Sequence, residues 1–270
     1  MPELPEVETV RRTLEPHVVG RRITAVAVRE RRLRRVIEDD FEARLGGRAI
    51  RGLDRRGKYL LVNLDNGETL LVHLGMSGSL HLRDRGVGAV LHDHVFIEID
   101  AREVVVLNDP RRFGAMRVGV ASEFAELSAI GPDPLTTVRS ANEWRQAVRD
   151  RKMPIKSLLM DQHFLAGIGN IYANEMLFAA GIRPRRAAAR LRRGELERLE
   201  EAMHAVLDRA VALGGSSISD FRDVRGKPGY FQIHHTVYDR GGQPCPRCAT
   251  PIRRIVVGGR STFYCPDCQR

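Results

Sequence analysis

Four cysteines near the end of the chain constrain its fold more than any other feature. Cys245 and Cys248 form one Cys-x2-Cys pair, and Cys265 and Cys268 form a second pair, with sixteen residues between the pairs. Paired elements at this distance are typical of a tetrahedral zinc site with four thiolate ligands. Because four protein ligands leave no open coordination position, we expect one structural Zn²⁺, with free or redox-active cysteines as the alternative.

The residues between the two pairs predict a β-hairpin. Residues 252–257 and 261–264 have strand character, and Gly258-Gly259 separates them. Arg260 therefore lies at the hairpin tip. A basic hairpin tip can enter a DNA groove or bind phosphate, although an arginine in a turn is also commonly just solvated.

The charge balance indicates a polyanionic partner. The 270 residues include 44 Lys or Arg and 34 Asp or Glu, which gives a net charge of +10 and favours nucleic acid. All four cysteines lie in the last 26 residues, a pattern unlike a disulfide framework. The N-terminus lacks the pattern of a signal peptide, and no apolar run reaches the roughly 18 residues of a membrane span. We expect a cytoplasmic, nucleoid-associated protein.

The first half of the chain predicts a helix followed by an antiparallel β domain. Apolar residues at helical spacing predict a helix from about Pro2 to Leu14, which should end or kink before Pro16. The following pattern favours short strands, and Asp65-Asn66-Gly67 is typical of a hairpin turn. We expect a sandwich or flattened barrel with strands at residues 23–28, 58–64, 69–74, 79–82, 95–99, 104–107 and 115–118.

The second half predicts helices after a clear boundary. The Gly-Pro-Asp-Pro run at residues 131–134 opposes any regular element, and Ser140 with Glu143 forms a capping-box pattern. Residues 216–230 read as a polar loop long enough to be functional. The predicted fold class is α+β. We predict an N-terminal β domain at residues 1–131, a linker at 132–135, a helical domain at 136–230 and the zinc hairpin at 231–270. The helical domain should contain helices near residues 154–160, 171–178 and 195–213.

The first six residues, Met-Pro-Glu-Leu-Pro-Glu, contain a candidate nucleophile. The small residue after Met1 favours removal of Met1, which exposes Pro2 as a secondary amine. An α-amino group titrates near ~8, and an unprotonated amine attacks carbonyl-like carbons to give a Schiff base. Glu3 is the adjacent candidate acid–base group. Taken alone, these residues are more often ordinary helix-start residues.

Three glycine-containing segments are candidates for DNA contact. Asn170 follows Gly167-Ile168-Gly169 before a helix, where phosphate binds favourably and where an ordinary N-cap is the alternative. Phe113 follows two arginines, so it can be an exposed wedge between base steps or an ordinary core residue. Met76 lies between glycines at 75 and 78 and is a second candidate wedge, although packing is the commoner role.

These segments together resemble the formamidopyrimidine-DNA glycosylase family. The matching runs are Met-Pro-Glu-Leu-Pro-Glu-Val-Glu-Thr, Leu-Gly-Met-Ser-Gly, Asn-Asp-Pro-Arg-Arg-Phe-Gly, Gly-Ile-Gly-Asn-Ile-Tyr-Ala-Asn-Glu and the zinc hairpin, in order along the whole chain. The resemblance implies an N-terminal helix with a β-sandwich, a helix–two-turn–helix domain and a zinc hairpin. It implies a monomer without an organic cofactor that removes 8-oxoguanine and formamidopyrimidines from double-stranded DNA and cleaves the strand by β,δ-elimination.

The resemblance also implies residue roles. Pro2 matches the nucleophile, Glu3 its acid–base partner and Lys58 the catalytic lysine, and Arg260 is counted with this catalytic group. The residues at 217–230 match the loop that closes over the flipped base. Met76, Arg112 and Phe113 match the residues that fill the vacated space, with Arg112 facing the orphaned cytosine, and His73, Lys156, Asn170 and Arg260 match phosphate contacts.

Two alternatives remain open. The sister family, endonuclease VIII, has the same architecture and acts on oxidised pyrimidines, but Leu4 and the intact set of Met76, Arg112 and Phe113 favour the purine enzyme. A non-catalytic zinc-ribbon DNA-binding paralogue is the other alternative. The joint presence of Pro2, Glu3 and Lys58 argues against it, whereas a retained Met1 would block the amine.

Overall fold

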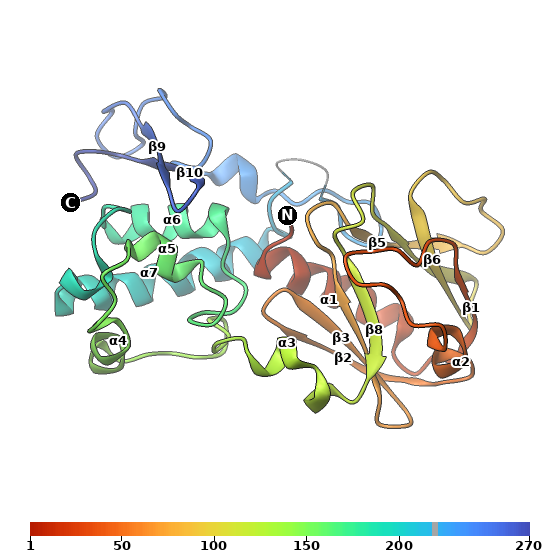
Figure 1. Ribbon diagram of the computed structural model, residues 1–270. Helices are drawn as coiled ribbons and strands as arrows, with labels where there is room; N and C mark the ends of the chain where they lie inside the picture. The colour runs from red at the N-terminus through yellow and green to blue at the C-terminus, as the bar shows by residue number, and fades with distance from the viewer. Residues whose placement is uncertain (218–220) are drawn as a thin grey trace. The chain divides into compact units, whose positions relative to one another are not determined.

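The computed structural model describes residues 1–217 and 221–270, which form two compact units (Figure 1). The first unit comprises Met1–Ala129 and Leu213–Tyr230, and the second comprises Ile130–Ala212 and Phe231–Arg270. This division differs from the predicted boundaries, because residues 213–230 belong to the N-terminal unit and the zinc hairpin shares a unit with the helices. No helix among the described residues is long and apolar enough to cross a membrane.

Helix α1 (Leu4–Val18) begins at a capping box formed by Glu3 and Glu6. The predicted end before Pro16 is wrong, since the helix continues through Pro16 to Val18. A proline this close to the helix end removes only one backbone hydrogen bond. The side chain of Val18 is buried, and this packing holds the last turn in place. The apolar face of α1 consists of Leu4, Val7, Val10, Leu14 and Val18.

Two antiparallel four-stranded sheets form the first unit, in the orders β1-β6-β7-β5 and β2-β3-β4-β8. Their apolar faces and α1 share one core, and the interior holds a cavity of only about 30 Å³. Strand β2 (Ile50–Arg56) was not predicted, because its run of charged residues and glycine hides the alternation. The other strands are β1 (Ile23–Val28), β3 (Tyr59–Leu64), β4 (Thr69–His73), β5 (Ser79–Asp84), β6 (Asp93–Ile99), β7 (Glu103–Asn108) and β8 (Ala115–Gly119), and the short helices are α2 (Phe41–Leu45), η1 (Ala121–Glu123) and α3 (Ala125–Ser128).

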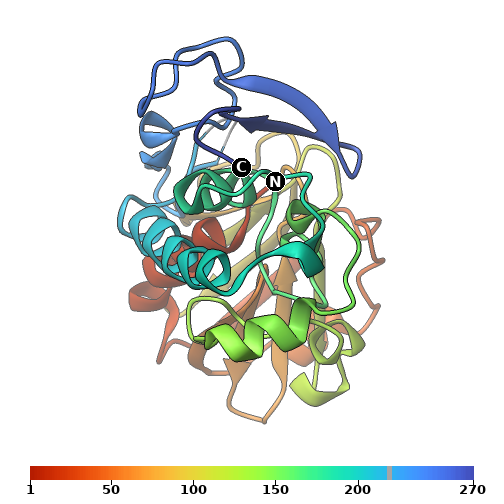
Figure 2. The ribbon, with the colours of Figure 1, turned by 90° about the vertical axis from the view of Figure 1, so that its left-hand side faces the viewer.

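The second unit is built around α6 (Asn170–Ala180), which is buried on nearly every side. Helices α5 and α7 and strand β10 contact it, and the hairpin of β9 and β10 lies over it in both views (Figures 1 and 2). The Ser140 capping box and the predicted hairpin are confirmed. The remaining elements are α4 (Ala141–Val148), α5 (Ile155–Leu159), η2 (Ala188–Arg190), α7 (Arg193–Ala212), η3 (Phe231–His234), β9 (Arg253–Val257) and β10 (Arg260–Tyr264).

Candidate active site and nucleic-acid interface

The start of α1 buries the candidate nucleophile. Pro2 is buried and Glu3 is 3% exposed, whereas Met1 is 48% exposed. With Met1 attached, the Pro2 nitrogen belongs to a peptide bond, so the amine chemistry requires removal of Met1. Met1 is exposed at the end of the chain, where an aminopeptidase can reach it.

Glu6 organises this end of the helix, and sequence reasoning did not single it out. Its carboxylate is 1% exposed and accepts hydrogen bonds from Glu3 N at 2.8 Å and from Ser216 N at 2.7 Å. Gly215 has a φ of +78°, and a Cβ there would lie 2.8 Å from Glu6 Oε1. Glu6 therefore joins the start of α1 to the segment 213–217. The only sequence signal for this role of Glu6 was its position three residues after Glu3, which is the spacing of a capping box.

Lys58 lies in the tight turn between β2 and β3. Its side chain is 7% exposed, and the preceding Gly57 has a φ of +58°. Arg55 donates to Gly57 O at 3.0 Å and to Glu8 Oε2 at 3.0 Å, which ties the turn to α1. Burial alone would raise the pKa of Glu8, but hydrogen bonds from Arg11, Arg12 and Arg55 lower this pKa to about 2. The Glu8 carboxylate therefore stays ionised at neutral pH and keeps its hydrogen bond to Arg55.

His73, at the end of β4, is held neutral. Burial, together with the smaller effect of the charges of Lys58 and Arg34, lowers the pKa of His73 to about 4. Its Nδ1 accepts a hydrogen bond from Gly75 N at 3.0 Å. The neutral ring therefore carries its proton on Nε2, which makes that atom the donor available to a phosphate oxygen.

Asp109 joins the two loops that carry the candidate wedges, and it too was missed. The residue is fully buried; Oδ1 accepts from Ser77 Oγ and Oδ2 from Gly114 N, both at 2.7 Å. Gly75 has a φ of +64°, and a Cβ there would lie 2.3 Å from the Phe113 backbone. Loops 74–78 and 109–114 therefore form one closely packed surface. An aspartate directly before a Pro-Arg-Arg run gave no sequence signal for a bond to a distant loop.

The three wedge candidates project from this surface. Met76 and Phe113 are each 40% exposed, so Phe113 is not a core residue. Arg112 has a φ of +56°, and its guanidinium donates to Glu30 Oε2 at 3.1 Å. The Arg111 guanidinium stacks 4.7 Å from the centre of the Phe113 ring. Two apolar side chains and two guanidinium groups are thus presented together.

In the second unit, Lys156 has a different environment from the one predicted. It is fully buried, and Nζ donates to Asn170 Oδ1 at 2.6 Å, Ser261 O at 3.0 Å and Thr262 Oγ1 at 2.6 Å. An ammonium group has three protons, and these bonds use all three. Lys156 therefore joins α5, α6 and β10.

Asn170 is the first residue of α6, and Gly169 is the N-cap. The N-cap alternative for Asn170 is wrong, because the side chain turns toward the hairpin and its Nδ2 donates to Ser261 O at 3.1 Å. Arg260 is exposed at the start of β10. A Cβ at Gly258 would lie 2.9 Å from Ser157 Oγ, so the hairpin tip packs closely on α5.

Two adjacent buried residues of α6 hold the zinc module, and sequence reasoning did not single them out. Asn174 Oδ1 accepts from Phe263 N at 2.8 Å. Glu175 accepts from the backbone N–H groups of Thr236, Val237 and Tyr238 at 2.8 to 3.0 Å. The Asn-Glu end of the glycine-rich run was the only sequence signal for this anchor.

The four cysteines converge as a metal centre requires. Their sulfur atoms lie within 4.8 Å of one another, with separations of 3.4 Å and 3.9 Å across the cluster. A tetrahedral site with Zn–S bonds of about 2.3 Å needs sulfur atoms about 3.8 Å apart. Backbone N–H groups of Arg247 and Cys268 point at Cys245 Sγ and Cys265 Sγ at 3.4 Å, as suits thiolates. The site fits one structural Zn²⁺, held by Cys245, Cys248, Cys265 and Cys268.

Comparison with known families accounts for nearly the whole chain. Residues 1–116 match the formamidopyrimidine-DNA glycosylase N-terminal domain, and residues 130–222 match the formamidopyrimidine-DNA glycosylase H2TH domain. Residues 242–270 match the zinc finger found in FPG and IleRS. The three matches follow the order of the two sheets, the helices and the hairpin.

Individual proteins of this family are similar to the chain over its full length. The formamidopyrimidine-DNA glycosylase of Thiobacillus denitrificans is 51% identical over 271 residues, covering 100% of both chains. The crystal structure of MutM (FPG) from Thermus thermophilus has a TM-score of 0.89 at 40% identity, covering 99% of this chain and 98% of that chain. A Lactococcus lactis FPG mutant in complex with Fapy-dG-containing DNA has a TM-score of 0.92 at 33% identity, covering 100% of both. The chain therefore belongs to the formamidopyrimidine-DNA glycosylase family of DNA-repair enzymes, which combine DNA glycosylase and AP lyase activities.

Proposed function

We propose that this enzyme excises oxidised purines, chiefly 8-oxoguanine and formamidopyrimidines, through a Schiff base on Pro2 and then cuts the strand by β,δ-elimination. The observation that carries the proposal is the buried start of α1, where Pro2 adjoins Glu3 and Glu6 fixes the Glu3 backbone. The Fapy-dG in the DNA of the Lactococcus lactis complex supports the substrate class.

The chemistry needs an exposed C1′ atom. Flipping the damaged nucleotide costs a few kcal/mol, least for a damaged pair. After Met1 is removed, the Pro2 amine attacks C1′ and the bond from C1′ to the base breaks, so that the base leaves with its electron pair and takes a proton. Glu3 is the proposed group that supplies and removes protons at this end of the helix.

Strand cleavage follows from the same intermediate. The C1′–O4′ bond then breaks, O4′ takes a proton, and the opened sugar carries a charged iminium on the Pro2 nitrogen. This iminium acidifies the C2′ proton. Loss of that proton breaks the C3′–O bond, and a second elimination breaks the C5′–O bond. Lys58, buried near the neutral His73, and Arg260 are the proposed proton-handling groups for these steps.

The DNA contacts are proposed from exposure and donor geometry. Met76 and Phe113 would occupy the space that the flipped nucleotide leaves, while the Arg112 guanidinium would face the orphaned cytosine. His73 Nε2, Asn170 and Arg260 would donate to phosphate oxygens. We assign Lys156 a positioning role, because its ammonium protons are used by Asn170, Ser261 and Thr262.

Part of the proposed closing loop, residues 218–220, lies outside the described residues. Of the rest, Ser217 Oγ accepts from Gly229 N at 2.8 Å and donates to Phe221 O at 2.6 Å. We further propose that the enzyme acts as a monomer on nucleoid DNA. Size-exclusion chromatography with light scattering tests the oligomeric state.

Single-turnover assays on a lesion panel test the substrate class. The duplexes carry 8-oxoguanine, a formamidopyrimidine, an oxidised pyrimidine or an abasic site opposite cytosine or adenine. We expect faster excision of both purine lesions opposite cytosine and product ends with phosphate on both sides of the gap. Faster excision of the oxidised pyrimidine would favour the endonuclease VIII-like alternative, and tight binding without cleavage by a protein lacking Met1 would favour the non-catalytic paralogue.

A further inference from the structure

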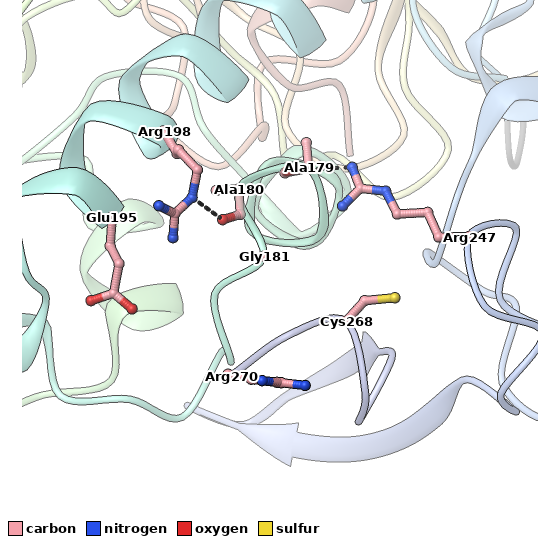
Figure 3. Close-up of a pocket in the computed structure, with 8 residues that line it drawn as sticks. All are labelled: Ala179, Ala180, Gly181, Glu195, Arg198, Arg247, Cys268 and Arg270. Atoms are coloured by element: carbon pink, nitrogen blue, oxygen red, sulfur yellow. Dashed lines mark hydrogen bonds between the residues drawn. The ribbon is translucent and has the colours of Figure 1, made fainter.

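A basic pocket of about 440 Å³ lies at the C-terminal end of α6, within the second unit. Figure 3 shows side chains from α7, the zinc module and the end of the chain gathered around this helix end. The function proposed above uses only the opposite, N-terminal end of α6, at Asn170. The lining residues are Ala179, Ala180, Gly181, Glu195, Arg198, Arg247, Cys268 and Arg270.

Three arginines give the pocket a positive charge that no acidic side chain among the described residues pairs with. Within the part of the chain that the structure describes, Arg198, Arg247 and Arg270 make no ion pair. The only acidic side chain in the lining, Glu195, is bonded by both oxygens to Arg186 and also accepts from Arg192 N. In contrast, many arginines of the first unit are paired, as Arg83 is with Asp93.

Two of these arginines already neutralise the helix end. Arg247 donates to Phe178 O at 3.2 Å and Ala179 O at 3.3 Å, while Arg198 Nε donates to Ala180 O at 3.2 Å (Figure 3). These bonds satisfy the carbonyl groups that a helix end leaves unpaired. A guanidinium has five N–H donors, so each arginine keeps donors for a ligand.

Arg270 is held in place by its backbone alone. Its N donates to Gly181 O at 3.1 Å, and its O accepts from Arg183 N at 3.0 Å. Its side chain makes no hydrogen bond to any of the described residues. The neighbouring Gln269 is fully buried and donates to Ile182 O at 2.8 Å, which fixes the segment further. The guanidinium is thus anchored at the pocket without an internal partner.

We propose that this pocket is a second phosphate-binding site, distinct from the contacts at Asn170. An eleven-residue helix is about 16 Å long, so the two sites lie at opposite ends of α6. The ligand is a phosphate group, which guanidinium groups bind with charge-assisted, often bidentate hydrogen bonds. The phosphate belongs either to a second DNA segment or to a free polyphosphate. The proposal is independent of the lesion chemistry at Pro2.

Calorimetric titration with inorganic pyrophosphate tests the site in the full-length, zinc-loaded protein. Arg270→Gln should weaken pyrophosphate binding about tenfold, as expected for the loss of one charge-assisted contact. The matched control is Arg145→Gln, which removes an equally positive, exposed side chain on α4 and should leave the affinity within about twofold. Both variants should keep the thermal midpoint and the wild-type cleavage rate on a single lesion duplex.

A second arm identifies the source of the phosphate. The protein is saturated with an unlabelled abasic-analogue duplex and then titrated with a labelled undamaged duplex. If a second duplex binds, if pyrophosphate displaces it and if Arg270→Gln weakens its binding, the phosphate belongs to DNA. If pyrophosphate binds but no second duplex does, the phosphate belongs to a free polyphosphate. Equal loss in Arg270→Gln and Arg145→Gln, or no pyrophosphate binding by the wild-type protein, would overturn the proposal.

Discussion

Lys156 is a buried charge to which we assign a positioning role beside the proposed DNA contacts. Its ammonium group joins Asn170 to the backbone and side chain of β10. The motif match predicts a phosphate contact, because sequence spacing does not reveal whether a lysine near a helix start points outward. Burial favours the positioning role, because this side chain lies entirely inside the second unit.

Replacing Lys156 by Met separates these roles. We expect Lys156→Met to destabilise the protein by about 3 kcal/mol, because three acceptors lose a charged donor, and to weaken DNA binding indirectly. Denaturant unfolding measures the first effect, with the exposed Lys152→Met as control. Unchanged stability, together with a salt-dependence slope reduced by about 0.9, would instead establish a direct phosphate contact.

The low pKa of His73 predicts that the stability of the protein depends on pH. Its pKa in the folded protein is about 4, below the ordinary value of 6.5, so the unfolded chain binds more protons between these values. Stability should therefore fall as the pH falls from about 6.5 to about 4, by on the order of 3 kcal/mol from this group. The comparison is the difference in unfolding free energy between pH 7 and pH 4.5 for the wild type and for His73→Gln. The same loss in both would contradict the assignment.

At the scale of elements, the strands of the first unit hold the two loops and the short turn that carry the candidate residues Met76, Phe113 and Lys58. Hairpin signals, strand alternation and the Ser140 capping box were sufficient to predict most elements. Short helices such as α2 and α3 were not predicted, because four or five residues carry too little periodicity. Helix α1 and strand β2 also differed: tertiary packing of Val18 outweighed Pro16, and pairing with β3 outweighed the charged sequence of β2. Contacts between distant segments, such as Glu6 with Ser216, have no local signature.

A variant of Asp109 tests whether this residue holds loops 74–78 and 109–114 together. In Asp109→Asn the Ser77 hydroxyl has to turn and accept from the amide N–H, while the amide oxygen accepts from Gly114 N, so both loop connections become weaker neutral hydrogen bonds. We expect a stability cost of about 2 kcal/mol and about tenfold weaker binding of a lesion duplex, as Met76 and Phe113 lose their common support. Fluorescence anisotropy measures the binding, with the exposed Asp84→Asn as control. Wild-type affinity in Asp109→Asn would show that the loops keep their arrangement without it.

At the scale of the whole molecule, the chain forms two units with separate cores, and the zinc cluster belongs to the second. The zinc ligands were predictable because their spacing alone defines the chemistry. The wedge residues were assigned only through the family resemblance, since local sequence left Phe113 undecided between core and surface. The basic pocket at the end of α6 had no sequence signal, because its arginines come from three separate segments.

Loss of zinc should therefore affect one unit. We expect Cys265→Ser to lose the metal and to weaken DNA binding, while the β-sandwich of the first unit stays folded, because a three-thiolate remnant binds zinc poorly. Metal analysis, DNA affinity and limited proteolysis of residues 1–129 give the three readouts. Full zinc content with wild-type affinity in this variant would contradict a structural role for the cluster.

The central claim is that the amine of Pro2 performs the reaction, and borohydride trapping tests it most directly. The protein, shown by intact mass to lack Met1, is incubated with a duplex carrying 8-oxoguanine opposite cytosine and reduced, and the crosslink is mapped by mass spectrometry. We predict a covalent adduct on Pro2. An adduct on Lys58 or another lysine, or DNA cleavage without any adduct, would contradict the claim.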